Sequence, residues 1–200
     1  MTPRLVFASL VLLLALGAGA FLGGTHLSDK VQAPRPSLAP LPRLTPEVSA
    51  RLFASRFRDQ HGQMQTLEQW RGTPLLINFW ASWCPPCRAE IPDLVALHQE
   101  TAQNNGQMIG ISVDLADKTQ KIAIDAGARY PLLLGEAEGL ALLPLLGNSV
   151  HALPYTLVID RNGEILLQHA GRVPLETLRR AWRTAQTSEQ GKKLEKEAGK

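Results

Sequence analysis

Residues 75–87 read Leu-Leu-Ile-Asn-Phe-Trp-Ala-Ser-Trp-Cys-Pro-Pro-Cys, and this stretch decides the fold. Its first seven residues form a nearly continuous apolar run, which is typical of a central strand buried on both faces. Apolar residues then recur at helical spacing, which predicts a helix over residues 85–102 with a kink at Pro92. A buried strand is therefore expected to pass into a helix at Cys84 and Cys87.

The pattern on either side extends this unit into an alternating domain. The further predicted elements are strands over 108–113 and 130–134, helices over 117–128, 138–146 and 174–184, and hairpins over 53–65 and 155–168. Asn162-Gly163 lies between the two apolar halves of the last hairpin and is a strong turn signal. Together these elements predict an α/β fold with an N-terminal hairpin and a mixed central sheet flanked by helices on both faces.

Composition excludes several classes of protein. The 200 residues suit one domain with appendages, and 44% hydrophobic with 20% charged residues excludes a fully disordered chain. A net charge of +3 is too small and too scattered for a nucleic-acid-binding protein. Cys84 and Cys87 are the two cysteines of the chain, which excludes a disulfide-stapled scaffold and a four-cysteine zinc module.

The N-terminus has the pattern of an export signal. Residues 5–25 carry no charge and would span about 30 Å as a helix, the thickness of a bilayer core. Arg4 precedes the run and favours a cytoplasmic N-terminus with export of the rest of the chain. Residues 1–25 are interpreted as an uncleaved signal anchor or, because Ala18-Gly19-Ala20 resembles a signal-peptidase site, as a cleaved signal peptide. A buried core helix is the remaining alternative, although the run lacks a polar face.

Two segments flank the predicted working domain, residues 49–185. Residues 26–48 are rich in proline and are interpreted as a semi-rigid spacer, because such a segment cannot pack a core. Residues 186–200 are polar and are interpreted as a solvated helix or tail, with a membrane-surface or partner-binding role as the alternative.

The cysteine pair carries the predicted chemistry. A sulfur at a helix N-terminus is favoured as thiolate, the attacking form in disulfide exchange. Cys84 is expected to lie exposed at the helix mouth and to attack a substrate disulfide, and Cys87, further inside, to resolve the mixed disulfide. Pro85 and Pro86 carry no amide hydrogen, so the Cys87 amide is the nearest donor left for the Cys84 sulfur. A less stabilised thiolate lowers the reduction potential and favours a reductant.

Three other readings of the pair remain open at this point. A static structural disulfide places no demand on the strand–helix junction. A metal half-site needs two more ligands, and the five histidines show no paired spacing. A chance pair is the third. No metal or cofactor other than a redox-active Cys84–Cys87 disulfide is expected.

Residues 78–87 resemble the active-site signature of the thioredoxin superfamily, and more closely its TlpA/ResA/DsbE-like branch of membrane-anchored thiol–disulfide oxidoreductases. The resemblance covers roughly residues 50–185. Residues 67–74 resemble the lead-in of this branch, with Thr73 in place of its lysine, and Pro92 matches its helix-kinking proline. The separation between Cys87 and Pro154 fits the central βα insertion of the branch.

The resemblance assigns roles to supporting residues. Pro154 is expected in the cis form, with the backbone of Leu153 pairing with a substrate peptide. Ala152-Leu153 departs from the small or β-branched residue that is common before this proline, which leaves substrate preference open. Trp83 is expected to be an exposed apolar lip that contacts substrate. Two neighbours get structural roles: Trp80 is expected in the core and His151 in a surface loop.

Glu90 has two readings. It is either an exposed glutamate that complements the helix dipole or, as in ResA-like members, an acid near the cysteines that tunes proton transfer. In the second case burial should raise its pKa. Asn78 stands where classical thioredoxins carry a buried aspartate, which favours Glu90 as the replacement.

The resemblance implies an exported reductase of protein disulfides. Its expected place is a bacterial inner membrane, single-pass with a periplasmic domain, or the periplasm itself after cleavage. Its expected partners are oxidised proteins, including apocytochrome c in cytochrome c maturation, and a membrane thiol relay that supplies electrons; no nucleic acid is expected. The alternatives are an oxidase or isomerase of the same fold, a tethered binding module with an inert disulfide, and a thiol peroxidase.

Overall fold

The computed structural model describes residues 43–101, 106–114 and 116–198. The predicted membrane segment, residues 5–25, and most of the predicted spacer lie outside these ranges. Within them, no helix combines the length and hydropathy needed to cross a bilayer.

Strands and helices alternate along the described chain. The strands are β1 (Arg56–Asp59), β2 (Met64–Thr66), β3 (Leu75–Trp80), β4 (Gln107–Ser112), β5 (Leu132–Leu134), β6 (Tyr155–Ile159) and β7 (Ile165–Ala170). The helices are α2 (Pro46–Ala54), the 3-10 turn η1 (Leu67–Trp70), α3 (Pro85–Thr101), α4 (Ala116–Asp125), α5 (Glu136–Leu145) and α6 (Leu175–Ala198).

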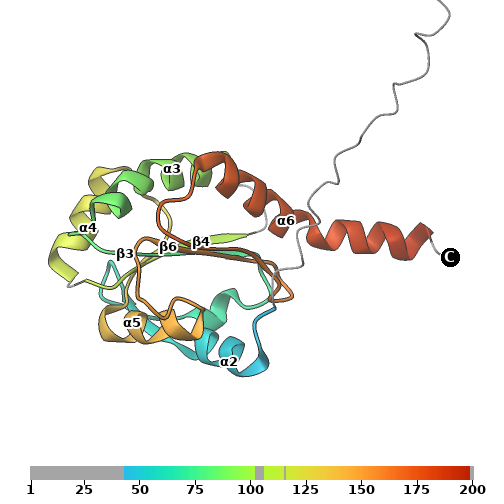
Figure 1. Ribbon diagram of the computed structural model, residues 1–200, viewed down its shortest axis with the longest axis horizontal. Helices are drawn as coiled ribbons and strands as arrows, with labels where there is room; N and C mark the ends of the chain where they lie inside the picture. Colours follow the sequence, from blue (N-terminus) through green and yellow to red (C-terminus); the bar gives the residue numbers. More distant parts are fainter. Residues whose placement is uncertain (1–42, 102–105, 115, 199–200) are drawn as a thin grey trace, which may run out of the picture. The chain divides into compact units, whose positions relative to one another are not determined.

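The strands of the described residues form one mixed sheet in the order β2-β1-β5-β4-β3-β6-β7. β3 lies near its centre, parallel to β4 and antiparallel to β6, and every residue of β3 is buried. Figure 1 shows α3 and α6 on one face of the sheet and α2 and α5 on the other. The predicted mixed sheet with helices on both faces is therefore confirmed.

The register of β3 and β6 fixes which loops meet at one end of the sheet. Phe79 pairs with Tyr155, and Leu75 pairs with Ile159. The end of β3, which leads to Cys84, and the start of β6, which follows Pro154, therefore lie at the same end of the sheet.

Both predicted hairpins form. In the hairpin of β6 and β7, Gly163 adopts φ 76°, a conformation that favours glycine, and the buried Asp160 accepts the main-chain N–H groups of Asn162 and Glu164. The first described residues lie against this turn, because the Leu44 N–H donates to the Gly163 carbonyl at 3.1 Å and the backbone of Arg43 forms an isolated antiparallel β-bridge with that of Glu164.

Helix α2 was not predicted. Its signals are present, since Thr45 accepts the Val48 N–H and Pro46 takes the first turn, where its missing N–H costs nothing. The sequence pattern instead places these residues in the proline-rich spacer or at the start of the hairpin. α2 buries Leu52 and Phe53, so this segment does contribute to the core. Helix α6 is also longer than predicted and continues to Ala198.

Candidate active site

The cysteine pair lies at the junction of β3 and α3, as predicted. Cys84 and Cys87 form a disulfide with their Cα atoms 5.3 Å apart. Cys84 directly precedes the first residue of α3, at the positive end of the helix dipole. The Cys87 N–H donates to the Cys84 sulfur at 3.3 Å, which confirms the expectation that this amide is the donor next to that sulfur.

The loop before the disulfide is held by the neighbouring strand. The Ser82 N–H donates to the Asp114 carboxylate at 3.1 Å, and the Ser82 hydroxyl contacts the same oxygen. The Val113 N–H donates to the Trp80 carbonyl at 2.9 Å, so the segment after β4 is fastened to the end of β3. These contacts fix the backbone that presents Cys84.

Exposure around the disulfide is concentrated in one side chain. Trp83 is 66% exposed and Trp80 is 2% exposed, in line with the predicted lip and core positions. Cys84 is 4% exposed and Cys87 is 1% exposed, so the expectation that Cys84 lies exposed is wrong for the oxidised form. In this form the Cys84 sulfur is bonded to the sulfur of the buried Cys87.

Glu90 is fully buried, one turn after Cys87 on α3. One carboxylate oxygen accepts the Val173 N–H at 2.7 Å, and the other accepts the Asn78 amide at 2.9 Å. The Asn78 amide also donates to the Thr156 hydroxyl at 2.9 Å. The reading of Glu90 as an exposed first-turn residue is therefore wrong.

Burial raises the pKa of Glu90 to about 7, although the hydrogen bonds from Val173 and Asn78 favour the ionised form. Nearby Asp93 pushes this pKa further up and Arg172 pulls it down. A carboxyl group with a pKa near neutrality can both accept and release a proton under physiological conditions.

The Leu153–Pro154 bond is cis, as predicted, and Pro154 is buried. The loop before it is closed by the buried Asn148, whose side chain donates to the Ala152 carbonyl at 2.9 Å and accepts the Ala152 N–H at 3.0 Å. After it, the Pro154 carbonyl accepts the Gly171 N–H at 2.7 Å. His151 is exposed in this loop, as predicted.

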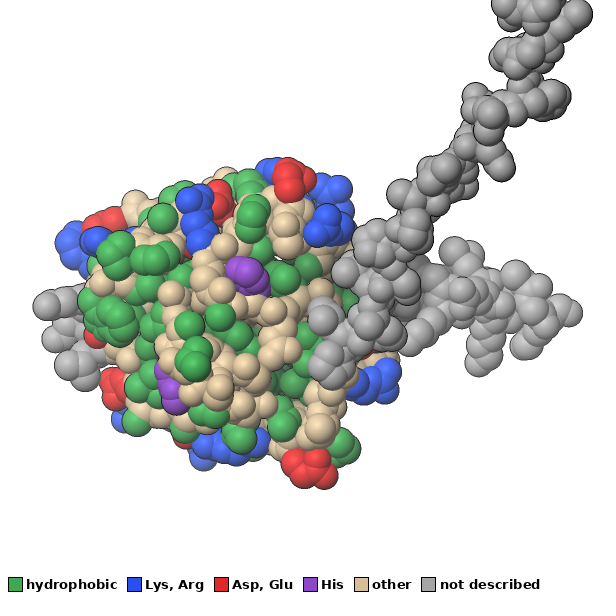
Figure 2. Space-filling view, in the orientation of Figure 1, with side chains coloured by type: hydrophobic (Ala, Val, Ile, Leu, Met, Phe, Trp, Pro, Cys, Tyr) green, Lys and Arg blue, Asp and Glu red, His purple; other side chains and the backbone are tan. Residues whose placement is uncertain are grey.

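The two sequence segments that contain the disulfide and Pro154 contain no charged residue. Residues 72–87 and 139–159 contain no Asp, Glu, Lys or Arg. Besides Trp83, this part of the sequence exposes Val150 at 79% and Leu145 at 46%. The exposed large apolar side chains of this part of the sequence are therefore those of Trp83, Leu145 and Val150, with Leu140 at 38%. Separately from these residues, which it does not label, Figure 2 shows one face of the domain with hydrophobic and uncharged side chains across its middle and charged side chains nearer the margins.

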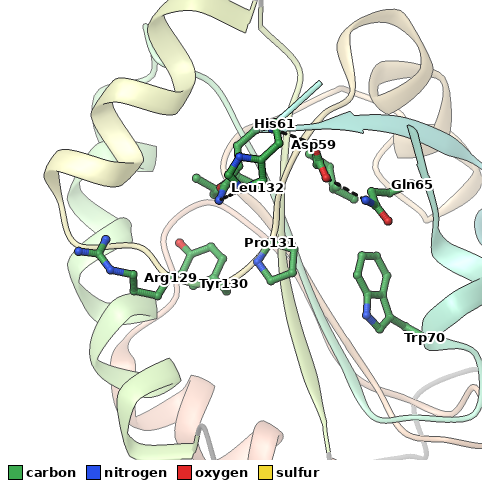
Figure 3. A pocket seen from close by; sticks show the side chains of 10 residues that line it. Asp59, His61, Gln65, Trp70, Arg129, Tyr130, Pro131 and Leu132 are labelled. Carbon is green, nitrogen blue, oxygen red and sulfur yellow. Dashed lines mark hydrogen bonds between the residues drawn. The ribbon is translucent and has the colours of Figure 1, made fainter. Parts of the chain in front are cut away.

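A separate pocket of about 270 Å³ lies beside the hairpin of β1 and β2 and contains no cysteine (Figure 3). Asp59, Gln65, Trp70, Arg129 and Tyr130 are among its lining residues. The Asp59 carboxylate is already occupied, because it accepts the side chain of Gln65 and the main-chain N–H groups of His61 and Gln63. We therefore interpret the acidic wall of this pocket as turn structure.

Sequence reasoning missed three residues that hold the site. Asn148 has a weak signal, since asparagine favours turns, but nothing marked its loop as the support of Pro154. Gly171 is a glycine after a strand, and its φ of 99° explains the residue type. Val173 acts through its backbone N–H, so its side chain carries no signal.

Comparison with known proteins places the chain among thioredoxin-like proteins. The sequence pattern of the AhpC/TSA family matches residues 45–168. The thiol–disulfide oxidoreductase ResA of Halalkalibacterium halodurans is 28% identical over 114 residues, which cover 56% of this chain and 62% of ResA. The thiol:disulfide interchange protein DsbE of Escherichia coli K12 is 36% identical over 120 residues, which cover 56% of this chain and 60% of DsbE. The chain thus covers about three fifths of the length of these curated relatives.

Solved structures agree with this placement. A thiol:disulfide interchange protein of the thioredoxin family from Chlorobium tepidum matches with a TM-score of 0.59 at 22% identity and covers 74% of this chain and 97% of its own. A thioredoxin-related protein from Neisseria meningitidis matches with a TM-score of 0.55 at 26% identity and covers 62% of this chain and 93% of its own. The predicted thioredoxin-like fold is confirmed.

Proposed function

The chain belongs to the AhpC/TSA family, and we propose that it is an exported thiol–disulfide oxidoreductase that reduces protein disulfides through Cys84 and Cys87. The observation that carries the proposal is the Cys84–Cys87 disulfide at the start of α3, formed by the two cysteines of the chain. With no further cysteine in the sequence, there is no structural disulfide with which the pair could scramble.

The proposed cycle starts from the reduced pair. The Cys84 thiolate attacks a substrate disulfide, so one substrate sulfur leaves as thiolate and the other is bonded to Cys84. The Cys87 thiolate then attacks the Cys84 sulfur, which closes the Cys84–Cys87 disulfide and releases the second substrate thiolate. Two electrons pass to the substrate, and a thiol donor must return two electrons before the next cycle.

Glu90 is the proposed proton acceptor and donor for this cycle. Cys87 must lose its proton before it attacks, and Glu90 lies one helical turn away with a pKa near 7. The buried position keeps the carboxyl group away from competing solvent protons. Asn78 and the Val173 N–H hold the carboxylate in a fixed orientation.

The donors around Cys84 support the proposed direction of the reaction. Pro85 and Pro86 have no N–H to offer, and the Cys87 N–H is the contact made with the Cys84 sulfur. Fewer donors stabilise the thiolate less, which lowers the reduction potential and favours donation of electrons. The same fold with a higher potential would work as an oxidase or isomerase, which is the second candidate.

Substrate binding is assigned to the loops around the disulfide. The backbone of Leu153 pairs with an extended peptide, and Trp83 covers its apolar side chains. Apocytochrome c before haem attachment is the substrate class that we propose from the resemblance to the ResA and DsbE branch. Proposed localisation is the periplasmic side of a bacterial inner membrane, where residues 5–25 keep the domain near a membrane thiol relay.

A thiol peroxidase is disfavoured by the residues before Cys84. Peroxidases of related fold carry a Pro-x-x-x-Thr/Ser-x-x-Cys loop. Counting back from Cys84, Ala81 takes the place of the hydroxyl residue and Ile77 the place of the proline.

The test is to trap the mixed disulfide. In cells that carry Cys87→Ala, Cys84 should stay bonded to its substrate, and dithiothreitol should release the partner after purification. A Cys84→Ala variant is the matched control and should retain no partner. If Cys87→Ala traps nothing, the disulfide is inert, and the alternative function of a tethered binding module is favoured. Equilibration of the wild-type pair with glutathione then gives the direction, since a strongly oxidising potential contradicts the reductase.

A further inference from the structure

The connector between β7 and α6 contacts the site at three places. The Gly171 N–H donates to the Pro154 carbonyl at 2.7 Å, and the Val173 N–H donates to the Glu90 carboxylate at 2.7 Å. Between them, the Arg172 guanidinium pairs with Asp93 on α3 at 2.8 Å. Three consecutive residues thus link the loop of Pro154, the carboxyl group of Glu90 and the helix that carries Cys87.

We propose that Gly171, Arg172 and Val173, together with the Arg172–Asp93 ion pair, form the positioning element that controls proton exchange at the dithiol by holding and polarising the Glu90 carboxyl group. The proposal rests on the proposed function, in which Glu90 exchanges protons with the thiols. Arg172 and Asp93 are positioning residues in this scheme, because they act on the sulfur atoms through Glu90.

The geometry makes this connector sensitive to the charge of Glu90. Both carboxylate oxygens accept from N–H groups, one from Val173 and one from Asn78. A proton on one oxygen adds a donor there and leaves that oxygen a weaker acceptor. Protonation of Glu90 is therefore expected to weaken one of the two contacts, and the Val173 contact is adjacent in the chain to the contact of Gly171 with Pro154.

Several charged or titratable groups act on Glu90. Asp93 from α3 disfavours its ionised form and Arg172 from the connector favours it. Tyr130, before β5, is buried, and its own pKa is raised by its burial and by Glu90. In the reduced protein the Cys87 thiol is a further group, one turn earlier on α3. Of these groups, Arg172 and Asp93 form an ion pair whose two members act oppositely: removal of Arg172 should raise the pKa of Glu90, and removal of Asp93 should lower it.

Because the two predicted shifts in the pKa of Glu90 have opposite signs, a general loosening of the structure around Glu90 cannot produce both. The probe is the full-length oxidised protein labelled with 13C at the glutamate carboxyl carbons, with the Glu90 resonance identified by its loss in Glu90→Gln. Arg172→Gln should raise the pKa of Glu90, and Asp93→Asn should lower it, each by about half a pH unit. Both variants break the same ion pair, so a purely structural effect would move the pKa in one direction.

The chain offers a control ion pair that also involves α3. Arg179 on α6 pairs with Glu100 on α3, and neither is among the charges that act on Glu90. Arg179→Gln and Glu100→Gln should leave the pKa of Glu90 unchanged. Equal shifts in the control variants, or shifts of one sign in Arg172→Gln and Asp93→Asn, overturn the proposal.

A second measurement separates this proposal from the proposed function. In the reduced protein, the pH at which iodoacetamide alkylation of Cys84 reaches half its maximal rate should shift with the Glu90 pKa in each variant. A shift in the Glu90 pKa without a shift in the alkylation profile overturns the link to the dithiol. Failure to trap a protein substrate contradicts the function but leaves both of these titrations interpretable.

Discussion

Two carboxylates of this molecule accept similar hydrogen bonds, but their pKa values are shifted in opposite directions. Glu90 accepts the Val173 N–H and the Asn78 amide, and Asp59 accepts the Gln65 amide and the N–H groups of His61 and Gln63. Burial raises the pKa of Glu90 to about 7. At Asp59 burial also acts upward, but the Gln65, Gln63 and His61 donors outweigh it and hold the pKa below its ordinary value.

The difference lies in what surrounds the donors. Glu90 is fully buried between α3, the sheet and the connector before α6, whereas Asp59 lies in the wall of an open pocket (Figure 3). Donors alone therefore do not identify a functional carboxylate. The carboxyl group that is available for proton exchange is the one that is buried and whose hydrogen bonds offset only part of the effect of burial on its pKa.

The largest expected effect on stability comes from placing a second carboxylate beside Glu90, with the same change beside Asp59 as the comparison. Asn78→Asp replaces a donor to Glu90 with an acceptor in a buried site, and we expect it to lower the free energy of unfolding by about 3 kcal/mol at pH 8. The loss should shrink at pH 5, where one of the two groups can be protonated and donate. Gln65→Glu makes the same change beside Asp59 and should cost less than about 1 kcal/mol, because water screens that pair. Urea unfolding of both variants measures this, and equal losses would contradict the comparison.

The next effect is the pH dependence of stability. Because the folded pKa of Glu90 lies above the unfolded value, the folded protein binds the extra proton, and its stability falls as the pH rises from about 4.5 to about 7. Glu90→Gln should remove about 2–3 kcal/mol of this decline.

Asp59→Asn tests the opposite sign on the same urea curves. The lowered pKa of Asp59 gives stability that is present above its unfolded pKa and is lost as the pH falls through its folded pKa. The difference between Asp59→Asn and the wild type should therefore disappear in acid.

A decline in stability between pH 4.5 and 7 that persists in Glu90→Gln would show that a group other than Glu90 causes the decline.

The smallest expected effect on stability concerns the exposed tryptophan. Trp83→Ala removes a side chain that is 66% exposed, and we expect the free energy of unfolding to change by less than about 0.5 kcal/mol. The rate of reduction of a protein disulfide should fall, while the rate with a small disulfide such as oxidised glutathione should not. His61→Ala, in the exposed pocket beside Asp59, should change neither rate. An equal loss of both rates in Trp83→Ala would contradict a role in protein recognition.

The sequence predicts the parts of the site that depend on local pattern. The apolar run of β3, the cysteine pair at the start of α3 and the turn at Asn162-Gly163 are properties of adjacent residues, and each is where the sequence places it. Helix α2 has an equally local signal in Thr45 and Pro46. It was missed because the surrounding proline content suggested a spacer.

The state of Glu90 could not be predicted from its own segment. Whether a glutamate one turn into a helix is exposed or buried depends on what packs against that helix, and here the partner is Val173, 83 residues away. The contact of the Val173 N–H with Glu90 leaves no pattern in side chains, whereas the Gly171 contact with Pro154 continues the pairing of β6 with β7 one position beyond Tyr155 and Ala170.

The contact of Leu44 with Gly163 places the first described residues at the end of β6 that lies opposite the disulfide loop. β6 runs from the end of the sheet that carries the disulfide to the turn that Leu44 contacts. Leu44 therefore lies at one end of β6, while the loop that carries the disulfide lies at the other end, about 16 Å away along a five-residue strand. The residues proposed to react with a substrate and the residues where the described chain begins are therefore separated by the length of β6.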